Sequence, residues 1–168
     1  MDAETLREVQ RPLKDQYRVD PDKAVLNLSA EGSLADAEVS CSVQTGRAMV
    51  RAGLHPATGG DGTMACSGDM LLQALVACAG VTLRSVATSR GIAVSGTVRA
   101  EGDLDCRGTL GIDREVPVGF RSIRLGFDLE SSAPDEDLDE LVAATKRYCV
   151  VYQTLVVPPQ IEVLRRAP

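Results

Sequence analysis

Residues 70–83 read MLLQALVACAGVTL, and this stretch decides the fold of the chain. Apolar side chains occupy nearly all positions around a helix with this sequence, which is typical of a helix buried on most of its faces. Ser67 can cap the start of such a helix, Asp69 suits the positive end of its dipole, and Gly91 ends it. The sequence therefore predicts one long, largely buried helix that runs to Arg90.

Short segments with alternating apolar and polar side chains flank this helix on both sides. Residues 25–30, 37–43 and 48–52 precede it, and residues 93–101 and 123–129 follow it. Turn-forming residues separate the segments, as is usual between the strands of an antiparallel sheet. We therefore expect antiparallel strands before and after the central helix.

Four further segments complete the expected order of elements. Residues 3–17 carry apolar side chains three or four positions apart, which predicts an amphipathic helix that Pro12 weakens in its middle. The glycine-rich residues 55–68 predict a long loop. A second amphipathic helix is expected at residues 134–148, and a final strand at residues 160–164. This order predicts an α+β fold with antiparallel sheets around a long central helix, and not the regular alternation of a doubly wound fold.

Length and composition predict a single domain over residues 1–168. A chain of 168 residues with 44% apolar residues is large and apolar enough to form one hydrophobic core. We expect residues 1–20 to form an N-terminal helical extension and residues 25–164 to form the core. The central helix is too apolar for one sheet to cover, so a second subunit is expected on its other side.

Composition also argues against several classes of function. The net charge of −6, the absence of tryptophan and an aromatic content of 3% argue against nucleic acid as a partner. No run of about 18 uninterrupted apolar residues appears, and the N-terminus lacks the order of a secretion signal. We therefore expect a soluble cytoplasmic protein without a membrane partner.

The same reasoning predicts no metal and no cofactor. The five cysteines show no CxxC spacing, and His55 is the single histidine, so a multi-histidine or four-cysteine site is not expected. The glycines at residues 59–62 match neither the GxGxxG nor the Walker pattern. We expect His55 to anchor its loop, with a minor alternative as a proton donor.

Two cysteines have surroundings that suggest chemistry. Cys78 lies inside the apolar helix, and Cys149 directly follows Lys146 and Arg147, whose charges favour a thiolate. Each has a plainer interpretation. A cysteine in an apolar helix is usually a small core side chain whose pKa is raised by burial, and cations are common at the C-terminus of a helix. The remaining cysteines are expected to be structural, although Cys66 could serve as a resolving thiol.

Two motifs resemble those of a known family, the OsmC and organic hydroperoxide resistance (Ohr) proteins. Residues 67–78, SGDMLLQALVAC, are similar to the helix leading to that family's peroxidatic cysteine, and residues 146–155, KRYCVVYQTL, to its tyrosine-cysteine motif. The resemblance covers roughly residues 25–163 and implies an intertwined homodimer with reaction sites at the subunit interface. It implies that Cys78 attacks an organic hydroperoxide, becomes a sulfenic acid and condenses with Cys149, and that a dithiol reductant resets the disulfide.

The chain departs from the family pattern where the peroxidases activate their thiol. Gly68 stands where the family has a glutamate, and Asp69 one residue later should lie roughly 180° around the helix from Cys78. No arginine aligns clearly with the family's activating arginine, and Arg47 and Arg51 are the nearest candidates. The chain thus resembles a divergent branch of the family, and the alternative to a peroxidase is a non-enzymatic dimer that binds an apolar small molecule or senses redox state.

Overall fold

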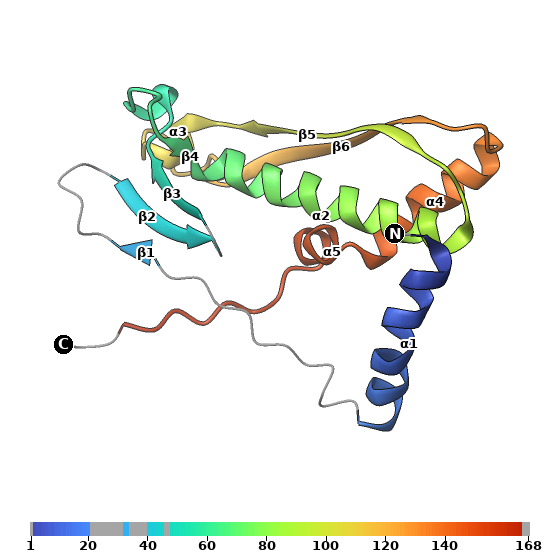
Figure 1. Ribbon diagram of the computed structural model, residues 1–168. Helices are drawn as coiled ribbons and strands as arrows, with labels where there is room; N and C mark the ends of the chain where they lie inside the picture. Colours follow the sequence, from blue (N-terminus) through green and yellow to red (C-terminus); the bar gives the residue numbers. More distant parts are fainter. Residues whose placement is uncertain (1, 21–31, 34–39, 46–47, 166–168) are drawn as a thin grey trace.

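The long apolar stretch forms helix α2, Ser67–Arg90, which runs through the middle of the molecule (Figure 1). Its C-terminus is at Gly91, whose φ of 71° and N–H bonds to the carbonyls of Ala87 and Thr88 end the helix as predicted. Its N-cap is Cys66, which makes no side-chain capping bond, so Ser67 is the first helical residue and not the predicted cap.

The structure is a computed structural model that describes residues 2–20, 32–33, 40–45 and 48–165.

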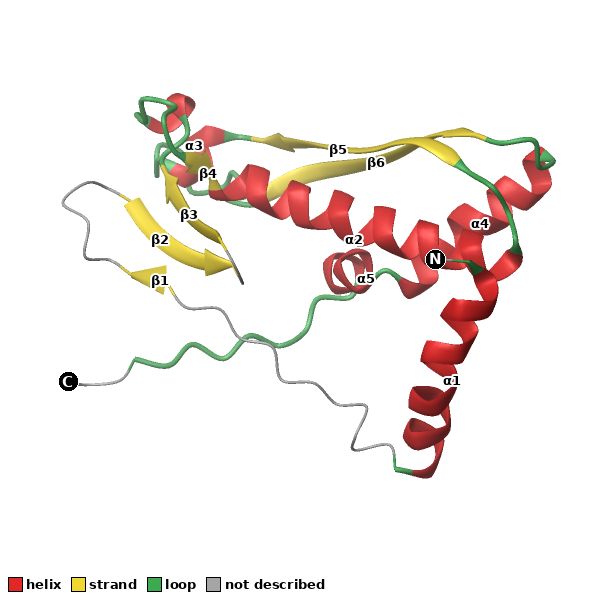
Figure 2. Cartoon of the chain, viewed as in Figure 1, coloured by secondary structure: helices red, strands yellow, loops and turns green. Residues whose placement is uncertain are grey.

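A two-stranded antiparallel hairpin lies along one side of α2 (Figures 1 and 2). It consists of β5, Ser95–Leu104, and β6, Phe120–Glu130, which include the two strands predicted after the helix. Alternate side chains of β6 are half-buried toward α2, while Arg124 and Asp128 are exposed and pair with acids and bases of β5. The hairpin therefore has one apolar face and one charged face, as a half-buried sheet requires.

A small sheet stands beside the start of α2 and contains two of the three strands predicted before it. Its order is β1, Gly32–Ser33, β2, Ser40–Thr45, β3, Ala48–Gly53, and β4, Ala65–Cys66. The pairs β1–β2 and β2–β3 are antiparallel as predicted, whereas the short contact between β3 and β4 is parallel. The strand predicted at residues 25–30 lies outside the described residues.

The predicted loop at residues 55–68 is mostly irregular, with one 3-10 turn, η2, at Pro56–Thr58, before β4. The Nδ1 atom of His55 accepts a hydrogen bond of 3.0 Å from the backbone N–H of Ala57. This bond fixes the start of the turn, which agrees with the loop-anchoring role expected for His55. After β5, a short helix, α3, occupies Cys106–Thr109.

Three helices complete the fold. The N-terminal helix α1, Ala3–Val19, passes through Pro12 without a break and leaves the core at an angle (Figure 1). The second predicted helix is α4, Asp135–Tyr148, and it is followed by α5, Val150–Val156, which the sequence pattern did not predict. Both α4 and α5 contact α2.

The strand predicted at residues 160–164 is wrong. After α5 the chain runs as an irregular, exposed segment to residue 165, and its apolar side chains face solvent, with Ile161 83% and Val163 89% exposed. An alternating pattern becomes a strand only beside a partner strand, and no described strand of this chain pairs with the segment.

The core lies where α2, α4 and the hairpin meet. Leu83, Ala87, Val94 and Leu141 are buried together, and half-buried residues of β6 and α4 surround them. The opposite side of α2 is open, since Val81 is 73% exposed. The observed fold is the predicted α+β arrangement around one long helix.

Among the described residues, α2 is the one helix long and apolar enough to cross a membrane by length and composition. The core helix of a soluble protein meets the same criteria, so this property is weak evidence for a membrane span. Here α2 packs against the hairpin, α4 and α5.

The core predicts a clear difference between two leucines. Replacing Leu141, which is fully buried, with alanine should lower the free energy of unfolding by about 2–5 kcal/mol, because the substitution leaves a cavity between α2 and α4. Leu110→Ala is the control, because Leu110 is 50% exposed. Urea unfolding at one fixed protein concentration measures both, and equal losses in the two variants would contradict this description of the core.

Candidate functional site

The structure brings Cys78 and Cys149 together, although they are far apart in the sequence. Cys78 lies near the middle of α2, and Cys149 lies in the break between α4 and α5, both of which contact α2. The two side chains are close enough for each thiol to shift the pKa of the other, and both are free thiols. The arrangement is a dithiol pair built from the centre of one helix and the junction of two others.

Cys149 is positioned by the backbone on both of its sides. Its N–H donates to the carbonyl of Thr145 at 2.9 Å and ends α4, while its sulfur accepts the N–H of Tyr152 at 3.5 Å and caps α5. The residue itself is extended, with φ −74° and ψ 110°. The side chain is fully buried, so Cys149 is held in one position by local geometry.

The start of α5 also provides donors for Cys78. Burial raises the pKa of the Cys78 thiol, but hydrogen bonds from the backbone N–H groups of Val151 and Val150 oppose it. The Cys149 thiol and the Thr82 side chain add further hydrogen bonds, and together these four bonds bring the pKa below its ordinary value. Hydrogen bonds to the charged form stabilise the thiolate at Cys78.

The pKa of Cys149 moves in the opposite direction. Burial raises it, and the hydrogen bond to Cys78 and the negative charge of the Cys78 thiolate raise it further. The structure thus reverses the expectation that Cys149 is the thiol better placed to ionise. Lys146 and Arg147 lie over the rings of Tyr152 and Tyr148, at 6.0 and 5.7 Å from the ring centroids, and burial dominates at the sulfur.

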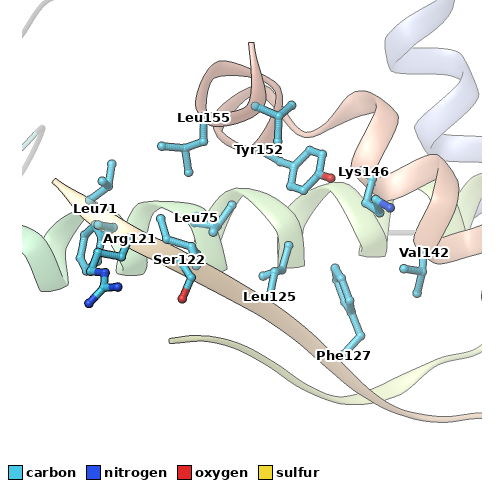
Figure 3. Close-up of a pocket in the computed structure, with 13 residues that line it drawn as sticks. Leu71, Leu75, Arg121, Ser122, Leu125, Phe127, Val142, Lys146, Tyr152 and Leu155 are labelled. Carbon is cyan, nitrogen blue, oxygen red and sulfur yellow. The ribbon is translucent and has the colours of Figure 1, made fainter. Parts of the chain in front are cut away.

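A cavity of about 760 Å3 lies between α2, β6, α4 and α5 (Figure 3). Leu71 and Leu75 line it from the face of α2 that also carries Cys78, because these positions are seven and three residues before the cysteine. Tyr152, whose N–H binds the Cys149 sulfur, lines it from α5. Most of the other lining residues are apolar, and two are cationic: Phe120, Arg121, Ser122, Ile123, Leu125, Phe127, Val142, Lys146, Leu155 and Val156.

The other described cysteines lie elsewhere. Cys66 and Cys106 line a second cavity of about 510 Å3 at the start of α2, together with His55 and Asp69. Cys66 precedes Cys78 by twelve positions, which is about 18 Å along a helix. Cys66 is therefore not placed to resolve an intermediate at Cys78. The side chain of Cys41, in β2, is outside the described residues.

The positions at which the chain departs from the family pattern face this second cavity. A side-chain carbon added at Gly68 would meet the Phe120 ring at 3.5 Å and the Cys66 sulfur at 3.6 Å. Asp69 is exposed there, as predicted from its angle to Cys78. A carboxylate at either position is thus directed to the start of α2.

The structure describes one of the two candidates for the activating arginine. Arg51 is exposed on β3, in the small sheet beside the start of α2, and Arg47 lies outside the described residues. Within the part of the chain that the structure describes, no group of three or more histidine, cysteine or acidic side chains is arranged to hold a metal ion.

Sequence reasoning did not find the donors that surround Cys78. Thr82 follows Cys78 by four positions, and this helical spacing could have identified it. The N–H groups of Val150 and Val151 depend on a helix break that no pattern predicts.

Comparisons with known proteins agree with this fold. Residues 60–163 match the family model of OsmC-like protein. No curated protein matches the chain in sequence. The crystal structure of an OsmC-like protein from Mycoplasma pneumoniae shares the fold with a TM-score of 0.66 at 16% identity, over 78% of this chain and 88% of that one.

Two further solved structures share the fold of this chain. A hypothetical protein from Aquifex aeolicus has a TM-score of 0.62 at 15% identity, over 80% of this chain and 90% of its own. An organic hydroperoxide resistance protein OsmC from Legionella pneumophila, described as a predicted redox protein and regulator of sulfide bond formation, has a TM-score of 0.57 at 15% identity, over 78% and 90%. The family match covers more than half of the chain, and the chain belongs to the OsmC-like protein family.

Proposed function

We propose that this protein is a thiol-dependent peroxidase that reduces organic hydroperoxides, with Cys78 as the peroxidatic and Cys149 as the resolving cysteine. The observation that carries the proposal is the pair of adjacent thiols, in which the pKa of Cys78 is lowered and that of Cys149 is raised. A peroxidase of this type needs one thiolate and one neighbouring thiol. The organic hydroperoxide resistance protein among the similar structures supports the same class of reaction.

In the first step the thiolate of Cys78 attacks the terminal oxygen of the hydroperoxide. An S–O bond forms, the O–O bond breaks, and the alkoxide leaves and takes a proton from solvent to become an alcohol. Cys78 is then a sulfenic acid, oxidised by two electrons, and the hydroperoxide is reduced by two. The donors at Val150, Val151 and Thr82 favour this step because they stabilise the attacking thiolate.

In the second step the sulfur of Cys149 attacks the sulfenic sulfur. A Cys78–Cys149 disulfide forms, and the hydroxyl group leaves with the Cys149 proton as water. The proximity of the two thiols supports this step. A dithiol reductant then donates two electrons and restores both thiols.

The cavity beside the pair indicates the kind of substrate. Its leucine, valine and phenylalanine side chains suit the hydrocarbon part of an organic hydroperoxide. The same cavity is the observation that favours the second candidate function, an OsmC-fold protein that binds an apolar small molecule without turnover. Peroxide consumption separates the two functions.

We further propose that the protein acts as a homodimer in the cytoplasm. The open side of α2, with Val81 exposed, and the exposed apolar residues of the segment after α5 provide surfaces for a second copy. Both strands of the β5–β6 hairpin have an edge that no described strand occupies. A partner that covers these surfaces explains why so apolar a helix is only partly buried within one chain.

The opposite pKa shifts predict a difference in reactivity between the two thiols. Alkylation of Cys78 by iodoacetamide should reach half its maximal rate at a pH below the value of about 8.5 for an ordinary thiol, because a lowered pKa leaves more thiolate at neutral pH. Cys149 should react only at higher pH. Peptide mass spectrometry resolves each cysteine, with glutathione as reference, and a Cys78 profile at or above that of glutathione would contradict the proposed activation.

Substitutions of the two cysteines should have different consequences. Cys149→Ser should consume about one equivalent of cumene hydroperoxide and stop with a sulfenic acid at Cys78, which dimedone traps, because the resolving thiol is gone. Cys78→Ser should consume none. Cys66→Ser is the matched control and should cycle normally with dithiothreitol, since Cys66 lies at the other cavity. If both thiols of the unmodified protein survive equimolar hydroperoxide, the non-enzymatic candidate replaces the peroxidase.

The proposed dimer predicts an effect at the open side of α2. Val81→Asp should shift the protein from dimer to monomer in sedimentation velocity, because a charge then enters the interface. Ile112→Asp is the control, because Ile112 is 70% exposed, close to the 73% of Val81, but lies in the loop after α3. A wild-type monomer, or a Val81→Asp dimer of unchanged affinity, would rule out this interface.

A further inference from the structure

Phe120 lies between two cavities beside α2. It is the first residue of β6, and it lines both the cavity of about 760 Å3 beside the dithiol pair and the second cavity of about 510 Å3 at the start of α2. Among the described residues, Phe120 is the one residue that these two cavities have in common. Its side chain is therefore a wall that the two cavities share.

Two glycines make room for the ring of Phe120. A side-chain carbon added at Gly102, on the neighbouring strand β5, would lie 2.6 Å from the ring, which is too close for two carbon atoms that are not bonded. A carbon added at Gly68, in the first turn of α2, would lie 3.5 Å from the ring. The ring thus reaches from β6 to the start of α2, in space that longer side chains at these two positions would need.

The cavity beside the dithiol pair extends along α2 toward this ring. Leu71 lines it seven positions before Cys78, which is about 10 Å along the helix. Figure 3 shows Leu71 at the same end of the cavity as Arg121, the residue that directly follows Phe120, and Lys146 toward the opposite end. A hydrocarbon chain that reacts at Cys78 and lies along this wall of leucines would therefore have its far end at Phe120.

On the other side of the ring the second cavity continues with apolar side chains. Leu54, Leu72 and Leu104 line it, and none of them lines the first cavity. An apolar chain gains free energy from each methylene group that leaves water for such a space. The second cavity would thus favour a longer chain, and the ring of Phe120 separates it from the first.

We propose that Phe120 is a specificity-determining residue, which closes the substrate cavity and sets the length of the hydrocarbon chain that the site accepts. In the wild-type protein a chain fills the cavity beside the dithiol pair and stops at the ring. Without the ring the two cavities join, and a longer chain extends to the start of α2. The inference rests on the proposed function for the identity of the chain as part of an organic hydroperoxide.

Calorimetric titration of the full-length protein with n-alkanols from butanol to dodecanol measures this length without any turnover. Each methylene group that enters the cavity should tighten binding about fourfold, and methylene groups that do not fit should add nothing. The Kd should therefore fall with chain length up to a break and then level off. In Phe120→Ala the break should move to a longer chain, and dodecanol should bind at least about tenfold more tightly than to the wild type.

Two further variants accompany Phe120→Ala. Leu104→Ala is the matched control, because Leu104 lines the second cavity and not the first, so the break should stay at the wild-type chain length. Phe120→Leu removes the ring but keeps an apolar side chain, and it should move the break in the same direction by a smaller amount. This milder variant decides the question if Phe120→Ala does not fold.

Three results would overturn the proposal. The first is a break at the same chain length in the wild type and in the Phe120 variants. The second is an equal movement of the break in Leu104→Ala, which would mean that the two cavities are already joined in the wild type. The third is an absence of alkanol binding by the wild type and every variant, which would mean that these cavities do not take hydrocarbon chains.

Hydroperoxide consumption separates this inference from the proposed function. A protein that does not consume cumene hydroperoxide, but whose break still moves in Phe120→Ala, would lose the peroxidase assignment and retain the role of Phe120. A protein that consumes the hydroperoxide, with the same break in Phe120→Ala and the wild type, would retain the peroxidase and lose the role of Phe120.

Discussion

The break in the helix at Cys149 is the constraint on which the candidate site depends. If α4 continued through this residue, the N–H groups of residues 150–152 would bond to carbonyls one turn earlier and would be lost to the site. Because Cys149 is extended, α5 begins anew, and its first N–H groups are available to the two sulfurs. One change of backbone direction thus positions Cys149, buries it, and supplies backbone donors for the Cys78 thiol.

Neutral hydrogen-bond donors lower the pKa of Cys78 by a different interaction from an ion pair. An arginine beside a thiol lowers its pKa through charge, which salt in the solvent screens. The backbone N–H groups of Val150 and Val151 that lower the pKa of Cys78 are neutral and act at short range, so screening has little effect on them. The absence of a carboxylate at Gly68 is therefore compatible with a reactive Cys78, because the thiolate is stabilised by groups that need no charged partner to orient them.

The sequence predicted the elements whose patterns are long. The apolar stretch at residues 70–83, the alternation in β5 and β6, and the amphipathic face of α4 each extend over enough residues to identify a helix or a strand. The short α5 was missed, since seven residues directly after a helix carry no periodicity of their own. The strand expected at residues 160–164 failed because pairing depends on a neighbour that a single sequence does not show.

The sequence likewise predicted some features of the candidate site and missed others. Cys78 and Cys149 were identified from their sequence surroundings and from resemblance to a family, and their contact follows from how α4 and α5 pack on α2. The expectation that nearby charges favour a thiolate at Cys149 was reversed, because Lys146 and Arg147 are obvious in the sequence whereas the burial of Cys149 is not. Backbone donors have no signature in the sequence at all. Thr82 did have one, in its spacing from Cys78.

The same geometry also governs how the proposed disulfide is reduced. Cys149 is fully buried and Cys78 is only partly so, which leaves the Cys78 sulfur as the one that a reductant reaches. Attack there makes Cys149 the leaving thiolate, and its raised pKa makes it a poor one. In the proposed cycle, the burial that keeps a proton on Cys149 for the release of water would also slow the return to the dithiol.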